Sequence, residues 1–215
     1  MSADSSVTPN HWSCGAVHPD GTLAAFYGVH SPQHADGARV MLPHDDALAA
    51  VGDDAVVSMT YDADAACIIE VSRNVAPKLP PVWFAELAEP DGAPPAVNLL
   101  AFVGHDVEPG TLLDREALRK VPVVSEDQLA AVRWYPGTGE VDQLYVAPHA
   151  RRRNLGTAMI LAAGTLNASR DWPPFWSDGQ RTSDGNRLIA GHPEWSHRAG
   201  ELVYLVPPMT PFDER

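Results

Sequence analysis

Apolar, β-branched residues come in short runs over the first hundred residues, and polar turn sequences separate the runs. Short runs of this kind are typical of strands, and Asp-Gly pairs favour the tight turns that join two strands. The pattern therefore predicts three β-hairpins, over residues 14–29, 55–71 and 82–103. Short helices are expected over residues 44–51 and 112–120, the second with Asp114 as a cap for its first turn.

The period changes to that of a helix in the second half of the chain. From Leu155 onward the apolar positions follow steps of three and four residues, which places them on one face of an α-helix that ends near Asn167. These positions are Leu155, Ala158, Met159, Ala162 and Leu166. A hairpin with strands at 129–135 and 140–146 is predicted before this helix. Two further elements are expected after it, a helix over residues 183–190 and a strand over residues 201–206.

Composition narrows the classes of function. The 215 residues carry a formal net charge of −13, which opposes binding to the phosphates of nucleic acids and to anionic membranes. An acidic protein with a local arginine cluster instead favours a small anionic ligand or a cationic amine substrate. No apolar run predicts a transmembrane helix, and the first residues lack the pattern of a signal peptide. We therefore expect a cytoplasmic protein, unless it is carried in a larger assembly.

The turn between the predicted strand and the predicted helix carries the clearest chemistry. Arg151, Arg152 and Arg153 precede Asn154, and Gly156 follows one residue later. Backbone N–H groups at a helix start lack partners and carry partial positive charge, and a glycine there lets an anion approach closely. Asn154 tolerates a left-handed backbone, so it can hold a turn geometry that otherwise requires glycine. The turn is therefore a candidate phosphate-binding site.

This segment resembles the acetyl-CoA-binding core of the GNAT N-acetyltransferases. The pattern of that family is an apolar strand that ends in Leu-x-Val, then a proline, then Arg/Gln-x-x-Gly-x-Gly/Ala at the start of a helix. Leu144, Val146 and Pro148 match this pattern. The run at 151–156 also matches, except that Asn154 replaces the first glycine.

The resemblance implies an α/β fold, with flanking helices on a mixed, mainly antiparallel sheet that splays where the cofactor enters. Residues 116–215 would form the GNAT-like half. Residues 1–115, rich in hairpins, would form either the first part of the sheet or a separate small β domain. Two family features are missing. The early pair of helices is not evident in residues 15–60. The late Asn-x-x-Ala-x-x-x-Tyr helix is replaced by the sequence RTSDGNRLIAG at 181–191, and this sequence resembles the tails of some phage-encoded GNAT-like proteins.

In this family an amine attacks the thioester of acetyl-CoA directly. The resemblance thus implies acetyl-CoA as co-substrate and a small-molecule or protein amine as acceptor, and it leaves a homodimer open. It places ten residues at the cofactor: Leu144, Tyr145, Val146, Arg151, Arg152, Arg153, Asn154, Leu155, Gly156 and Thr157. Glu140 and Asp142 are the candidates to accept the proton of the amine, because strand alternation would place both on the side of Leu144 and Val146. Plain solvated hairpin residues are the alternative for both.

A second function remains open from the same residues. The late-helix tyrosine that protonates the leaving thiolate in the family has no counterpart between Tyr145 and Tyr204. Together with the missing early helices, this favours a catalytically degenerate GNAT-like module with a structural or interaction role, for example in a virion. Pairs of histidines such as His192 and His197 have no cysteine or carboxylate at zinc spacing, so we expect no metal.

Overall fold

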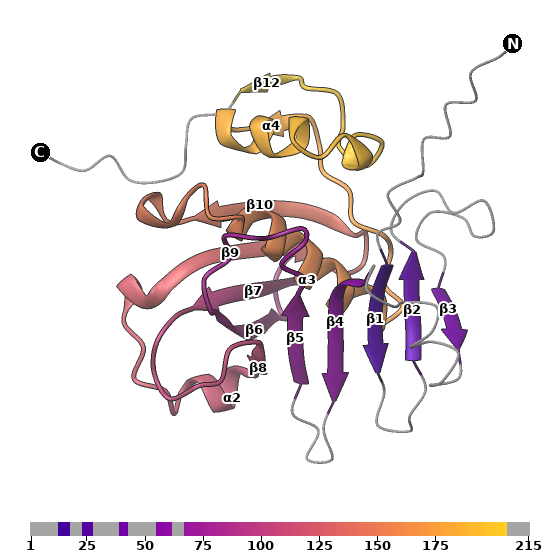
Figure 1. Cartoon of the computed structure of the whole chain (residues 1–215). Coiled ribbons are helices and arrows are strands. Elements are labelled where there is room, and N and C mark those ends of the chain that lie inside the picture. Colours follow the sequence, from indigo (N-terminus) through magenta and orange to yellow (C-terminus); the bar gives the residue numbers. More distant parts are fainter. Residues whose placement is uncertain (1–12, 18–22, 28–38, 43–54, 62–66, 206–215) are drawn as a thin grey trace, which may run out of the picture.

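The computed structural model describes residues 13–17, 23–27, 39–42, 55–61 and 67–205. In these ranges ten strands form one sheet in the order β10-β9-β7-β6-β8-β5-β4-β1-β2-β3 (Figure 1). Its strands are β1 (Ser13–Val17), β2 (Leu23–Tyr27), β3 (Arg39–Leu42), β4 (Ala55–Tyr61), β5 (Cys67–Val71), β6 (Trp83–Glu89), β7 (Ala96–Phe102), β8 (Thr111–Leu113), β9 (Gln128–Tyr135) and β10 (Glu140–Val146). Among the ten strands of this sheet only β1–β4 and β6–β8 pair in parallel, so the predicted mixed, mainly antiparallel sheet of an α/β protein is confirmed.

Local turn signals predicted the hairpins correctly. The pairs β1–β2, β4–β5, β6–β7 and β9–β10 are all antiparallel neighbours, and their bounds exceed the predicted ranges by no more than one residue, at Ser13 and Gln128. Strands from both sides of residue 115 meet in the sheet, because β7 pairs with β9. The helix expected over residues 44–51 lies outside the described residues.

Helix α3 (Leu155–Ser169) lies across one face of the sheet (Figure 1) and extends two residues beyond the predicted end. All five positions of the predicted apolar face are buried, as expected. Leu161, Ala163 and Thr165 are buried as well, so the helix is covered on more than one side. A helix that is apolar nearly all round belongs inside a protein. Here the sheet covers one side, and the chain that follows α3 covers another.

The opposite face of the sheet holds a smaller apolar cluster around Trp83 and Phe102, whose rings stack with centroids 4.7 Å apart. Leu118 of the short helix α2 (Arg115–Leu118) packs against it. The helix predicted over 112–120 is thus shorter than expected, although Asp114 does cap it by accepting a hydrogen bond from Ala117 N. The prediction was wrong at its start because residues 111–113 pair with β5 and β6 as strand β8.

The C-terminal part of the chain forms a small lobe above β10 and α3 (Figure 1). It contains β11 (Gln180–Arg181), α4 (Ser183–Ala190), a 3₁₀ turn at Pro193–Trp195 and β12 (Tyr204–Leu205). Helix α4 has the predicted bounds, and Thr182 caps it through a hydrogen bond from Gly185 N to its hydroxyl. The last strand is shorter than expected and pairs in parallel with β11.

Candidate functional site

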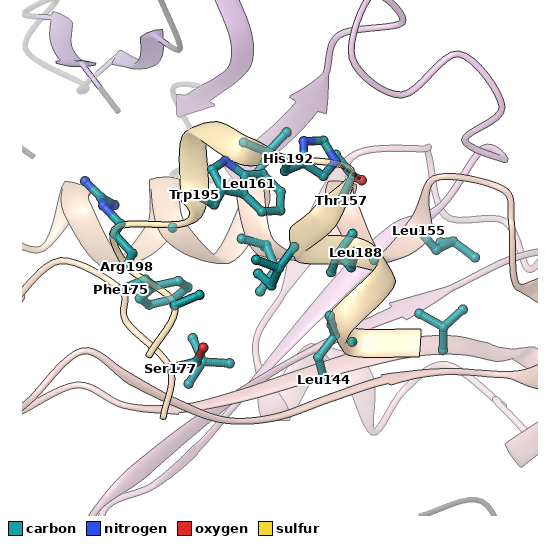
Figure 2. Close-up of a pocket in the computed structure, with 18 of the residues that line it drawn as sticks. Leu144, Leu155, Thr157, Leu161, Phe175, Ser177, Leu188, His192, Trp195 and Arg198 are labelled. Atoms are coloured by element: carbon teal, nitrogen blue, oxygen red, sulfur yellow. Dashed lines mark hydrogen bonds between the residues drawn. The ribbon is translucent and has the colours of Figure 1, made fainter. Parts of the chain in front are cut away.

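A cavity of about 910 Å³ lies between β10, helix α3 and the C-terminal lobe (Figure 2). Leu144 comes from β10, Leu155 and Leu161 come from α3, and Leu188 comes from α4. A volume of this order is typical of sites for small molecules and cofactors, which are mostly apolar with a few polar groups. The cavity is therefore the place where the predicted site residues can be compared with the structure.

The cavity opens where two neighbouring chain segments separate. The chain after α3 returns parallel to β10, and Val141 N donates a hydrogen bond to Trp176 O at 2.8 Å while Trp176 N donates to Gly139 O at 3.1 Å. Beyond Trp176 the chain leaves β10 and pairs with β12 instead. Both segments line the cavity past this point, so the backbone edge of β10 borders it.

Two residues fix the place where the chain after α3 meets β10. Gly139 has φ 75°, and a side chain there would lie 2.2 Å from Pro174 O, so only glycine fits. Asn167, nearly fully buried at the end of α3, donates from Nδ2 to Pro173 O at 2.7 Å. Together they fix the point at which the returning chain meets β10.

The turn before α3 has the geometry that its sequence predicts. Asn154 adopts the left-handed conformation, with φ 61° and ψ 13°, and Arg152 has φ 63°. The Asn154 side chain does not cap the helix but accepts a hydrogen bond at 3.1 Å from Lys78 N in the loop between β5 and β6. Asn154 thus both bends the turn and attaches it to a neighbouring loop.

The start of α3 presents unpaired donors to the cavity. Its first internal bond runs from Ala158 N to Asn154 O at 2.9 Å. Within the described parts of the chain, the N–H groups of Leu155, Gly156 and Thr157 have no acceptor. A side chain at Gly156 would come 3.5 Å from Leu188, so α4 already lies over this helix start.

Cationic side chains dominate the charged lining, although the protein as a whole is acidic. Among the described residues that line the cavity, the basic ones outnumber the carboxylates six to three. The basic residues are Lys78, Arg151, Arg152, Arg181, Arg187 and Arg198, and the acidic ones are Asp142, Asp171 and Asp184. A cationic cavity in a protein with net charge −13 favours an anionic ligand.

The three arginines of the turn do not behave alike. Arg151 is half-buried, donates from Nε to Val146 O at 3.2 Å and pairs with Asp184 of α4 at 3.3 Å. Arg152 is exposed and reaches the cavity. Arg153 is exposed and lies outside the cavity lining. The other nine residues predicted at the cofactor all line the cavity.

A β-bulge interrupts β10 at Asp142. Val141 lies opposite Trp134, and the next pair joins Gln143 to Arg133, so Asp142 is the extra residue. Trp134 is fully buried in the core that α3 covers, and Arg133, its neighbour along β9, points to the other face. The bulge therefore shifts the alternation of the strand by one residue.

The predicted placement of Glu140 and Asp142 was wrong because of this bulge. The Asp142 carboxylate accepts hydrogen bonds from Arg133 Nη1 at 2.6 Å and from Tyr135 Oη at 2.8 Å. Glu140 lies directly opposite Tyr135. Glu140 and the carboxylate of Asp142 thus lie on the face away from α3, although Asp142 also borders the cavity, whereas Leu144 faces the helix. The bond to Asp142 raises the pKa of the Tyr135 hydroxyl, and bonds to Asp142 and to Glu89 raise the pKa of Arg133.

The C-terminal lobe supplies polar residues that the sequence did not single out as a site. His192 Nε2 lies 2.9 Å from Thr157 Oγ1, and its ring stacks on Trp195 with centroids 4.0 Å apart (Figure 2). Arg198 borders the same space. The contact between His192 and Thr157 joins segments that are far apart in the chain, so spacing along the sequence could not predict it. The only sequence signal for a site in this lobe was the run at 181–187, which contains basic residues and a helix cap. Tyr204 is half-exposed and donates to Gln180 Oε1, outside the lining.

Comparison with protein-family models, with curated proteins and with solved structures finds no match for this chain. No helix in the described ranges combines the length and the apolar character needed to cross a membrane. The described residues also contain no group of three or more His, Cys, Asp or Glu side chains close enough to hold a metal ion.

Proposed function

We propose that the chain binds acetyl-CoA in this cavity and transfers the acetyl group to an amine, as the resemblance to the GNAT N-acetyltransferases implies. The observation that carries the proposal is the position of the cavity. It lies where β10 and the returning chain separate, and the unpaired N–H groups of α3 face it. These are the places that the resemblance assigns to the pantetheine arm and the pyrophosphate.

The residues present fit such a ligand. The outer edge of β10 offers backbone groups of Leu144 and Val146 for amide hydrogen bonds, whereas those of Tyr145 face β9, as the bond from Ala147 N to Leu129 O indicates. The N–H groups at 155–157 and the side chain of Arg152 suit phosphate oxygens, because charge-assisted bonds to anions are the stronger ones. Arg151 can join them only after it releases Asp184.

The transfer step needs one proton acceptor and no covalent enzyme intermediate. The amine nitrogen attacks the thioester carbonyl carbon, the C–N bond forms, and the C–S bond breaks with its electron pair going to sulfur. The amine loses one proton and the thiolate gains one. We assign the proton of the amine to His192 rather than to Asp142, because His192 stands in the cavity beside Thr157, whereas the carboxylate of Asp142, at the cavity border, already accepts hydrogen bonds from Arg133 and Tyr135.

Calorimetry with acetyl-CoA tests the proposal. The wild-type protein should release or absorb heat on binding, and Gly156→Glu should weaken binding by about a hundredfold, since it places a carboxylate among the phosphate donors. Gly137→Glu is the matched control, because a side chain at Gly137 meets nothing within 4 Å and lies outside the cavity. No heat and no thermal shift at millimolar acetyl-CoA would refute the proposal.

A separate variant tests the proton acceptor. His192→Asn should lower the rate of acetyl transfer by about a hundredfold or more, with little change in acetyl-CoA affinity. An unchanged rate would remove His192 from the reaction.

Two observations favour the alternative, a GNAT-like module without catalysis. Leu188 already lies over Gly156, and the two acidic residues of β10 point away from α3. In that case the lobe is a permanent cover and the cavity takes no cofactor. A folded wild-type protein that binds neither acetyl-CoA nor CoA would support this structural or interaction role.

A further inference from the structure

Arg181 is the last residue of β11 and stands directly before the cap of α4. It borders the cavity, and two of its guanidinium nitrogens, Nε and Nη1, are fully enclosed. Neither nitrogen has a hydrogen-bond partner among the described residues. In the described structure, Arg181 is thus a partly buried cation without an acceptor.

A buried guanidinium without acceptors lowers the stability of the protein as long as no ligand is bound. Arginine stays protonated in proteins, so it cannot avoid the cost of burial by losing its charge, and its five N–H groups remain donors. Buried donors are nearly always satisfied, and each specific exception needs an explanation. An unsatisfied buried cation destabilises the folded state, so its retention beside a cavity points to a partner that arrives from outside.

The neighbouring carboxylate does not supply the acceptor. Asp184 lies in the first turn of α4, only three residues from Arg181. Its Oδ2 pairs with Arg151 Nη1 at 3.3 Å and its Oδ1 with Arg187 Nη1 at 3.2 Å. Asp142 is bound by Arg133, and Asp171, the third acidic residue of the lining, also has a partner of its own.

We propose that Arg181 binds an oxyanion, a carboxylate or a phosphate group, of a molecule held in the cavity. No hydrogen bond or ion pair within the described residues holds the guanidinium in its present place, so it can turn toward a ligand. Guanidinium groups recognise both kinds of oxyanion well. The inference rests on the proposed function only for the identity of the molecule, which is either acetyl-CoA or an acceptor amine that carries a carboxylate. The anion site itself does not require acetyl transfer.

Three variants test the site. Arg181→Leu removes the charge, Arg181→Lys keeps the charge without the planar group, and Arg153→Leu removes an exposed arginine that lies outside the cavity. Affinities for pyrophosphate, for acetyl-CoA and for free amino acids beside their amides are measured by calorimetry. Arg181→Leu should weaken binding of the oxyanion probe about tenfold or more, Arg181→Lys by less, and Arg153→Leu not at all.

The probes separate the two sources of the oxyanion. Weaker binding of pyrophosphate and acetyl-CoA in Arg181→Leu assigns Arg181 to the phosphates of the co-substrate. Loss of the preference for free amino acids over their amides, measured with acetyl-CoA present, assigns it to the acceptor. Wild-type protein that binds these anions through Arg181 but transfers no acetyl group refutes the proposed function and leaves this site standing.

Thermal unfolding without ligand provides an independent arm. Because Arg181→Leu removes an unsatisfied buried cation, its melting temperature should rise by about 2–8 °C. Affinities that are unchanged for every probe in both Arg181 variants would overturn the proposal. A lower melting temperature in Arg181→Leu together with unchanged binding would assign Arg181 to the fold instead.

Discussion

Replacing Asn154 tests how the turn before α3 is held. Asn154 combines a left-handed backbone with a hydrogen bond from Lys78 N to its Oδ1, and the two contributions can be separated by two substitutions. Glycine keeps the backbone conformation and loses the hydrogen bond. Alanine loses the hydrogen bond and is also strained by the positive φ.

The expected sizes follow from these two terms. A hydrogen bond of this kind is worth about 1 kcal/mol net. The left-handed conformation costs a residue with a Cβ roughly 1–2 kcal/mol, from which glycine is exempt and asparagine partly so. We therefore expect losses of stability of about 1 kcal/mol for Asn154→Gly and about 2 kcal/mol for Asn154→Ala. For a chain of this size, these correspond to about 2–4 °C and 4–8 °C in melting temperature.

Thermal and denaturant unfolding monitored by circular dichroism measure both variants. Arg153→Ala is the control, because Arg153 is exposed, lies in the same turn and has no positive φ, so its effect should stay within about 0.5 kcal/mol. Under the proposed function, the acetyl-CoA affinity of the same samples should survive in Asn154→Gly, which introduces the glycine that the GNAT pattern has at this position. Equal stability of the glycine and alanine variants would refute the claim that the backbone conformation matters.

Three further substitutions test other parts of the structure. Asp142→Asn should lower the melting temperature by only about 1–3 °C and change the acetyl-transfer rate less than tenfold, because the Asp142 carboxylate pairs with Arg133 on the far face of the sheet. A hundredfold loss of rate would instead indicate that Asp142 accepts the proton of the amine. The pKa of Glu89 lies below its ordinary value, chiefly through the hydrogen bond from Arg133. Its contribution to stability is therefore complete above the unfolded pKa, about 4.3, and is lost as the pH falls through the lower folded value. Glu89→Gln should accordingly show a smaller difference in melting temperature between pH 7 and pH 3 than wild type, and an equal difference would contradict this. Leu166→Ala, at a fully buried position of α3, should cost about 2–5 kcal/mol in denaturant unfolding, whereas a loss below 1 kcal/mol would mean that α3 is not in the core.

The features that the sequence predicted correctly are those that short segments determine. The steps of three and four after Leu155 define a buried helix face without reference to any other element. Asn154 adopts a left-handed conformation because of its own side chain and the turn around it. The hairpins follow from turn residues that lie between their two strands. In each case the interactions that decide the structure are close together in the chain.

The features that it missed depend on distant partners. Residues 111–113 become a strand because β5 and β6 lie on either side of them, more than twenty residues away in the chain. The bulge at Asp142 depends on how β10 pairs with β9, and a strict alternation cannot reveal it. Arg181 and His192 reach the cavity only because the C-terminal lobe folds back over α3. The spacing of residues within one segment of the sequence cannot predict contacts of this kind.

The position of β10 at the end of the sheet also bears on how the protein behaves in concentrated solution. Backbone groups at a sheet edge can pair with the edge of another chain, which is a common start of aggregation. Helix α4 and the rest of the lobe stand above this edge (Figure 1), and the Arg151–Asp184 pair ties α4 to the turn that follows β10. The cover over the cavity thus also shields the strand from self-association. A molecule that binds in the cavity must therefore cover the outer edge of β10 itself and form hydrogen bonds with its backbone groups.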